Sequence, residues 1–105
     1  NHGGRVLDHC PATAEVLPEI VDAVGGKLAI FVDGAIRSGM DMFKALALGA
    51  DAVLIGRPFV TTIYGGGEEG VQLYVQKLKA ELADTMRMCG AHSLAEIKRS
   101  MLFGF

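Results

Sequence analysis

The sequence predicts an α/β fold in which parallel strands alternate with helices. Two predicted strands, the apolar run 28–32 and the segment 51–55, which is apolar from Ala52 on, lie on either side of a segment whose apolar residues recur with a helical period. Continuously apolar runs of this length are typical of strands that are buried on both faces of a parallel sheet. Glycine-bearing turns follow both runs, at Asp33-Gly34 and at Gly56. The stretch is therefore predicted to form one β-α-β unit with a right-handed crossover.

A helix is predicted ahead of the first strand, over 14–24. Apolar residues at spacings of one, three and four positions share a face of this segment, and Gly25-Gly26 ends it. Pro18 lies inside the pattern, so we expect the helix to begin near it or to bend there.

A second helix is predicted between the two strands. Ser38 is followed three residues later by Asp41, the pattern of a capping box at a helix start. The apolar residues that follow can share one face, and Gly49 is a natural C-cap. After the second strand, Pro58 fits the first turn of a further helix.

The longest helix is predicted over 71–88. Its apolar stripe consists of Val71, Tyr74, Val75, Leu78, Leu82 and Met86. A second capping box, from Ser93 to Glu96, predicts a short helix that contains Ile97.

The segment 65–70 matches the pattern GxGxxG by letter. No convincing strand precedes it, and Glu68 and Glu69 would repel a pyrophosphate at that place. We therefore interpret 65–70 as a flexible connection between helices.

Composition narrows the class of protein. The chain has 105 residues, 50% hydrophobic and 21% charged, with a formal net charge of −2, which is typical of one globular domain over residues 1–105. This balance argues against disorder and against nucleic acid as a partner. No apolar stretch approaches the roughly 20 residues that span a bilayer. Two cysteines without CxxC spacing favour a reduced, cytoplasmic location.

Turns near Gly3, Gly34 and Gly56 are predicted at the carboxyl ends of strands, where α/β folds bind ligands. Two full strands and the end of a third resemble the last part of a (β/α)8 barrel, whose usual length is about 250 residues. The start at Asn1, without an initiating Met, is consistent with a piece of a longer chain. We expect the strand edges and inward faces to be exposed without the remaining strands.

His2 and Arg5 lie three residues apart in the segment His2-Gly3-Gly4-Arg5. Histidine titrates near neutrality and suits a general base, and arginine can bind a carboxylate through two parallel hydrogen bonds. These two residues predict a base and a carboxylate clamp in one pocket. The alternative is an exposed, polar terminal loop without a function.

Two loops combine small residues with arginine, 33–39 and Gly56-Arg57-Pro58. Loops at the ends of the last two barrel strands often form a phosphate site together with a helix N-terminus, so we interpret them as a phosphate cradle. The alternative is that their glycines only make turns and that both arginines pair with surface carboxylates. His9 and Cys10 complete no four-ligand metal site with His2, so no metal is predicted.

Four motifs carry a resemblance to a known family. They are Asn-His-Gly-Gly-Arg at 1–5, Phe-Val-Asp-Gly-Ala-Ile-Arg-Ser-Gly at 31–39, Lys-Ala-Leu-Ala-Leu-Gly-Ala at 44–50 and Ile-Gly-Arg-Pro at 55–58. Together they resemble the FMN-dependent α-hydroxy acid oxidases and dehydrogenases, which include glycolate oxidase, lactate oxidase and flavin lactate dehydrogenases. The resemblance covers essentially the whole chain and corresponds to the family's last third.

The resemblance implies a role for each matched residue. It implies that His2 is the catalytic base and that Arg5 binds the carboxylate of a small L-2-hydroxy acid of the lactate or glycolate type. The residues that would hold the ribityl and phosphate groups of FMN are Asp33, Gly34, Arg37, Gly56 and Arg57. Ala35 departs from the family, which usually has a second glycine there, and only a compatible backbone angle would make its methyl group harmless.

Other parts of the family's site would lie upstream, so we expect the 105 residues alone to be inactive and to hold FMN weakly. We expect a homo-oligomer, or pairing with a separate amino-terminal half of the barrel. One alternative function is an inactive half-barrel that binds or self-associates. Another is a different phosphate-binding barrel, related to inosine monophosphate dehydrogenase or type 2 isopentenyl diphosphate isomerase, which the His2 to Arg5 motif argues against.

Overall fold

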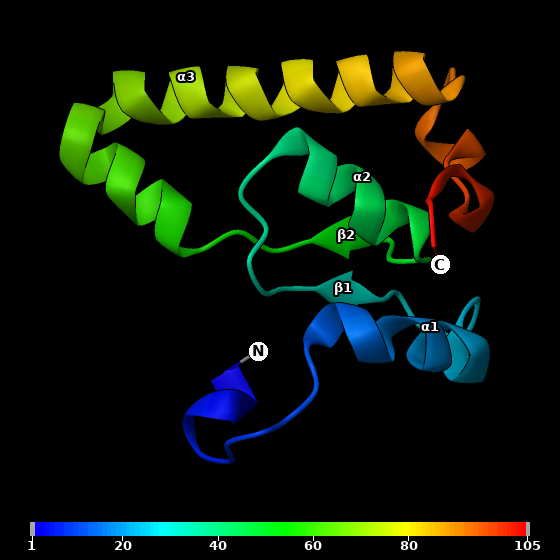
Figure 1. The fold of residues 1–105 in the computed structure, drawn as a ribbon. Helices are drawn as coiled ribbons and strands as arrows, with labels where there is room; N and C mark the ends of the chain where they lie inside the picture. The colour runs from blue at the N-terminus through cyan, green and yellow to red at the C-terminus, as the bar shows by residue number, and fades with distance from the viewer. Residues whose placement is uncertain (1, 105) are drawn as a thin grey trace.

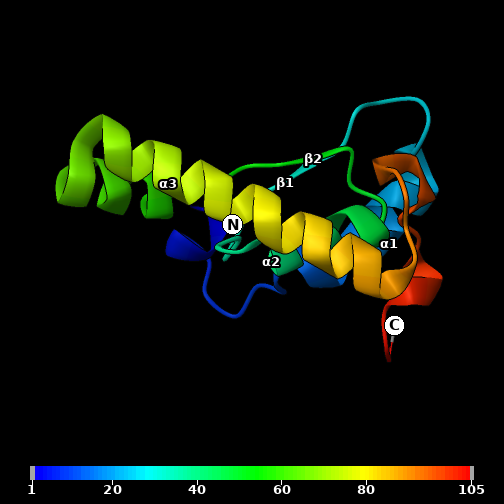
Figure 2. The same ribbon diagram turned by 90° about the horizontal axis from the view of Figure 1, so that it is seen from above.

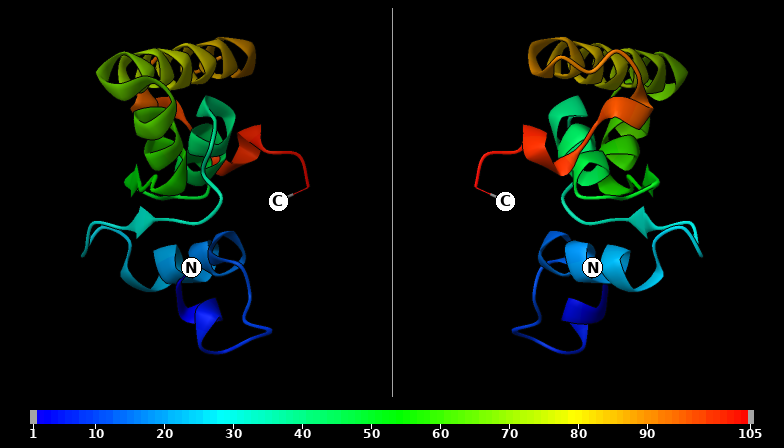
Figure 3. Two further views of the ribbon diagram at one scale, coloured as in Figure 1. Left: turned by 90° about the vertical axis from the view of Figure 1, so that its left-hand side faces the viewer. Right: turned by 90° about the vertical axis from the view of Figure 1, so that its right-hand side faces the viewer.

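The computed structural model describes residues 2–104, and Figure 1 shows its fold. The regular elements in chain order are a 3-10 turn at His2–Arg5, α1 at Thr13–Val24, β1 at Phe31–Val32, α2 at Gly39–Ala47, β2 at Ala52–Val53, α3 at Arg57–Cys89, and 3-10 turns at Leu94–Glu96 and Arg99–Met101. Figure 3 shows these elements stacked as α1, the sheet, α2 and the carboxyl-terminal part of α3. None of the described helices is both long and apolar enough to cross a membrane.

The predicted β-α-β unit is confirmed. β1 and β2 pair in parallel, with Phe31 opposite Ala52, and α2 lies between them in the chain. The Asp51 carboxylate accepts the Ile30 N–H at 2.7 Å, which fixes the start of the pairing. The Leu54 N–H donates to the Val32 carbonyl at 2.9 Å and extends it.

The strands differ from the prediction in length and in burial. Each is two residues long, where runs of five were expected, and only one side is covered. Ile30 and Val32 are buried, whereas Phe31 is 61% exposed and Leu54 is 53% exposed. The reason is that, among the described residues, each strand pairs only with the other, so no further strand extends the ladder. The exposed inward face agrees with the expectation for part of a barrel.

The hydrophobic core lies between the sheet, α1 and α2. Its buried members are Leu17, Ile30, Val32, Ala45, Leu48 and Ala50. Leu17 comes from α1, which contains Pro18 and begins five residues before it, so Pro18 does not mark the helix start. The helices α1 and α2 thus pack against one face of the sheet, and Phe31 and Leu54 on the other face stay exposed.

The helix α2 begins as predicted. Ser38 Oγ accepts the Asp41 N–H at 3.1 Å, and the Asp41 carboxylate accepts the Ser38 N–H at 3.1 Å, which together form the capping box. The cap residue at its other end is Leu48, and Gly49 follows it with φ of 105°. The fully buried Phe43 anchors the helix to its neighbours.

The helix α3 bends back on itself at Gly67, whose φ is 55° and ψ is −138°. We call residues 57–66 the first arm and residues 68–89 the second arm. Helical structure continues on both sides of Gly67, so the predicted connection over 65–70 is wrong in extent and shrinks to this residue. The second arm then runs across the top of α2, as Figure 2 shows from above.

Gly39 allows α2 and the second arm to approach closely. A Cβ atom on Gly39 would lie 2.5 Å from the Leu78 carbonyl oxygen and would also overlap the Leu82 backbone nitrogen. The Glu81 carboxylate accepts the Gly39 N–H at 2.9 Å. Gly39 is therefore a packing residue between two helices.

The second predicted capping box is not formed. Ser93 makes no side-chain cap bond to the backbone, and the Glu96 carboxylate accepts the N–H of His92, at 2.9 Å, in place of that of Ser93. The segment makes only a 3-10 turn at Leu94–Glu96, and Ile97 follows it in an extended conformation.

Candidate functional site

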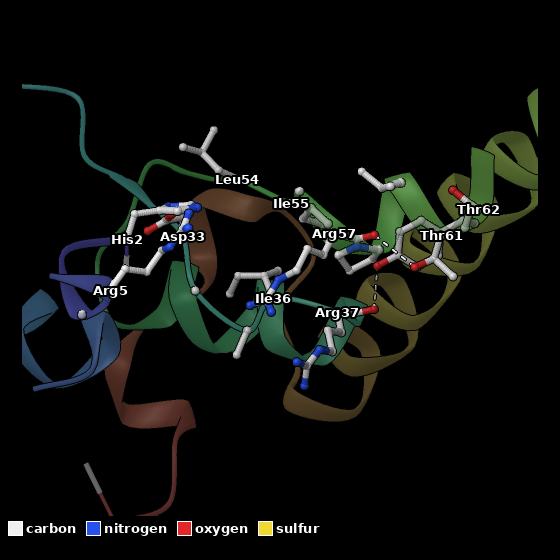
Figure 4. A pocket seen from close by; sticks show the side chains of 17 residues that line it. His2, Arg5, Asp33, Ile36, Arg37, Leu54, Ile55, Arg57, Thr61 and Thr62 are labelled. Atoms are coloured by element: carbon white, nitrogen blue, oxygen red, sulfur yellow. Dashed lines mark hydrogen bonds and ion pairs between the residues drawn. The ribbon is translucent and has the colours of Figure 1, made fainter. Parts of the chain in front are cut away.

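The loops after β1 and β2 and the turn at His2–Arg5 surround one hollow of about 1340 Å³ (Figure 4). All the residues predicted for the site line it, namely His2, Arg5, Asp33, Gly34, Arg37, Gly56 and Arg57. Small-molecule sites typically measure roughly 300–1,000 Å³, so the hollow has room for a cofactor and a small substrate. The carboxyl ends of two parallel strands meet at the same edge of the sheet, which explains why loops that are separated by a whole helix in the chain converge there.

His2 and Arg5 lie at one end of the hollow, together with Asp33 (Figure 4). The 3-10 turn carries both His2 and Arg5, and both are exposed. The Asp33 carboxylate oxygen lies 3.6 Å from His2 Nδ1, and Asp33 itself is only 30% exposed. The Asp33 carbonyl accepts the Thr13 hydroxyl at 2.5 Å, which ties this end of β1 to the start of α1. An imidazole with a carboxylate beside it is an arrangement suited to accepting a proton.

Arg37 and Arg57 also line the hollow, away from His2 (Figure 4). Within residues 2–104, neither arginine forms an ion pair with a carboxylate. The ion pairs that the alternative interpretation expects are thus not formed among these residues. Two uncompensated guanidinium groups make this end of the hollow favourable for an anion.

The backbone amides divide into two groups. Those at the start of α2 are taken, because Asp41 accepts the Arg37 and Ser38 N–H groups and Glu81 accepts that of Gly39. Among the described residues, no hydrogen bond accounts for the N–H groups of Gly34, Ala35, Ile36, Gly56 and Arg57. The free amides thus belong to the two loops that line the hollow and to the start of α3, where Pro58 occupies the first turn as predicted.

Ala35 adopts a conformation that favours glycine. Its φ is 57°, directly after Gly34 with φ of 107°. The left-handed region is unfavourable for a residue with a Cβ atom, by roughly 1–2 kcal/mol. The backbone angle is therefore not one that makes the alanine harmless.

These residues fit FMN. A phosphate carries negative charge that the guanidinium groups of Arg37 and Arg57 can balance, and free loop amides can donate to its oxygens. The opposite end holds the imidazole of His2 and the guanidinium of Arg5. Within the described residues, no group of three His, Cys, Asp or Glu side chains is arranged to hold a metal ion.

Tyr74 is a residue of the hollow that sequence reasoning did not predict. It lines the hollow, and its hydroxyl donates to the Arg37 carbonyl at 2.9 Å. The helical period placed Tyr74 on the apolar stripe of the second arm, and only the bend at Gly67 brings that arm over the loop. Periodicity gives the face of a helix and not the loop that the face meets.

Comparison with known proteins gives one consistent result. Residues 1–103 match the FMN-dependent dehydrogenase family. An L-lactate oxidase of Roseobacter sp. (strain GAI101) is 49% identical over 105 residues, which are 100% of this chain and 28% of that protein. A peroxisomal (S)-2-hydroxyacid oxidase of Arabidopsis thaliana is 48% identical over 100 residues, covering 95% of this chain and 28% of the relative.

A solved structure agrees with these relatives. A crystal structure of a mandelate oxidase variant superposes with a TM-score of 0.88 at 45% identity, over 94% of this chain and 30% of that one. The chain thus spans less than a third of the length of the proteins it matches. The structural relatives are TIM-barrel flavoenzymes, which confirms the predicted fold class and FMN as the family's cofactor.

The family match covers residues 1–103, which include every residue predicted for the site. It therefore argues against the alternative of a different phosphate-binding barrel. The motifs, the shared hollow and the structural likeness all lead to the same conclusion. The chain belongs to the FMN-dependent dehydrogenase family.

Proposed function

We propose that the full-length protein containing this chain oxidises a small L-2-hydroxy acid, of the lactate or glycolate type, to the 2-oxo acid with FMN. One observation carries this proposal: His2 and Arg5 share a single hollow with Arg37 and Arg57. The similar proteins named as a lactate oxidase and as a 2-hydroxyacid oxidase support the substrate class.

Arg5 binds the substrate carboxylate in this proposal. Its planar guanidinium can donate two parallel hydrogen bonds to the two carboxylate oxygens, which fixes the orientation of the acid. The α-hydroxyl and α-carbon are then held at the same end of the hollow as His2.

His2 accepts the proton from the substrate. Asp33 lies beside Nδ1 and favours the tautomer with the proton on that nitrogen, so Nε2 remains free to accept the proton. The same carboxylate stabilises the imidazolium that forms. FMN, when bound, supplies an acceptor for the two electrons that leave the substrate.

In this proposal the phosphate of FMN is held by Arg37, Arg57, Gly34 and Gly56. Asp33 helps to hold the ribityl group. The unpaired guanidinium groups and the free loop amides support this assignment.

A cytoplasmic location stays a prediction. The partner also stays a prediction, either a second copy in a homo-oligomer or a separate amino-terminal half of the barrel.

The experiment is His2→Ala in the full-length protein, assayed by anaerobic reduction of bound FMN with L-lactate or glycolate. A general base contributes typically 10²- to 10⁴-fold, so we expect the reduction rate to fall by at least 100-fold while the FMN content stays the same. His92→Ala is the matched control, because His92 is exposed and lies outside the hollow. Unchanged reduction in His2→Ala would remove the base assignment.

A further inference from the structure

Tyr74 joins three segments at the arginine end of the hollow. It lies on the second arm of α3, and its hydroxyl donates to the Arg37 carbonyl in the loop after β1 at 2.9 Å. Its ring meets the Phe59 ring of the first arm edge-on, with centroids 5.1 Å apart and planes at 72°. The two arms and the loop are therefore held together at one side chain.

The backbone of Arg37 is held from both sides. Its N–H donates to the Asp41 carboxylate at 3.1 Å, and its carbonyl accepts from Tyr74. With both backbone polar groups fixed, the Arg37 side chain starts from a fixed Cα atom. The residues directly before it, Gly34 to Ile36, carry the free amides of the loop.

The Tyr74 hydroxyl is available as a donor over a wide pH range. Burial raises the pKa of Tyr74, and the nearby Glu81 and Asp41 carboxylates raise it further. The hydroxyl therefore stays protonated at neutral pH and can donate to the Arg37 carbonyl.

We propose that Tyr74 is a positioning residue for the phosphate of the cofactor. By holding the Arg37 carbonyl, it keeps Arg37 and the amides of Gly34 to Ile36 in a fixed arrangement before the phosphate binds. Preorganisation of this kind strengthens binding because less ordering is needed when the ligand arrives. The inference rests on the proposed assignment of Arg37 and Arg57 to the phosphate.

The test compares FMN with riboflavin, which lacks the phosphate. The full-length apoprotein with Tyr74→Phe is titrated with each flavin, and the loss of flavin fluorescence gives the two dissociation constants. Loss of one net hydrogen bond predicts that Kd for FMN rises roughly 3- to 10-fold. Kd for riboflavin should stay within about twofold of the value for the unchanged protein. Inorganic phosphate is added as a competitor of FMN, and its own affinity should fall by the same factor as that of FMN.

Tyr64→Phe is the matched control. Tyr64 is the only other tyrosine, lies on the first arm, and is 89% exposed outside the hollow. Its substitution should leave both dissociation constants unchanged.

Three outcomes overturn the inference: no change in Tyr74→Phe, an equal loss of affinity for both flavins, or a variant that does not fold. The last two would give Tyr74 a purely structural role. Arg57→Ala tests the phosphate site separately. If Arg57→Ala also leaves the preference for FMN over riboflavin unchanged, the proposed phosphate site is wrong; if only Tyr74→Phe leaves it unchanged, the positioning role alone is wrong.

Discussion

At the scale of single residues, Ala35 is the position where the residue type does not suit the backbone conformation. With φ of 57°, it sits next to Gly34 in the loop that lines the hollow. The sequence shows that Ala35 departs from the family's glycine, but it does not predict the φ angle of Ala35. That angle depends on the contacts that hold the loop in place. Those contacts are hydrogen bonds from other elements, such as Tyr74 to Arg37.

Ala35→Gly should stabilise the protein. Glycine removes the Cβ penalty at positive φ but adds freedom to the unfolded chain, so the net gain is about 0.5–1 kcal/mol. The measurement is the midpoint of thermal unfolding of the full-length protein, which should rise. Ala45→Gly, at a buried position of α2, should lower the midpoint by a similar free energy. A lower midpoint for Ala35→Gly would show that the alanine is not strained.

The other site residues could be predicted because their chemistry is local. His2 with Arg5, and the two arginine loops, were identified from residue type and from their place after strands. The pairing of Asp33 with His2 could not be predicted, since it depends on how the turn at His2–Arg5 folds onto the end of β1.

At the scale of elements, local patterns predicted the helices well and the strands less well. The capping box at Ser38 and Asp41 is complete within four residues, so the start of α2 follows from sequence. Strand length depends on neighbouring strands, and of the predicted run at 28–32 only Phe31–Val32 forms a strand. The three consecutive glycines at 65–67 suggested a loop, yet only Gly67 leaves the helix.

Gly67→Ala should destabilise the bend of α3. A φ of 55° with ψ of −138° is accessible to glycine and costs other residues about 1–3 kcal/mol. We expect a lower midpoint of thermal unfolding. We also expect weaker FMN binding, because the bend brings Tyr74 to the Arg37 loop.

Gly65→Ala is the control for this prediction. Gly65 lies in the same run but within the helix, and no atom lies within 4 Å of an added Cβ. Alanine there should be stabilising by about 0.5–1 kcal/mol. Equal effects of the two substitutions would contradict a bend that depends on Gly67.

At the scale of the whole molecule, one face of the sheet lacks a cover. On this face, Phe31 and Leu54 are both more than half exposed. Apolar surface that stays in water forgoes roughly 25 cal/mol for each Å². The chain spans less than a third of its relatives, so a sequence of this length can specify the site's loops but not the surface that closes them.

The isolated 105 residues should therefore neither bind FMN tightly nor reduce it. The measurement is a fluorescence titration of the purified 105-residue chain with FMN, followed by addition of a 2-hydroxy acid. The full-length protein serves as the positive control. Tight binding with flavin reduction by the isolated chain would contradict this prediction, and a stable, inactive assembly would favour the half-barrel as a binding piece.

In the proposed function, one hollow holds the phosphate at its arginine end and the acid at its histidine end. A crystal structure of the full-length protein with FMN and pyruvate tests it most directly. We expect the FMN phosphate between Arg37 and Arg57, and the pyruvate carboxylate bound by Arg5 with His2 facing its α-carbon. A phosphate bound elsewhere, with Arg37 and Arg57 facing solvent, would contradict the account.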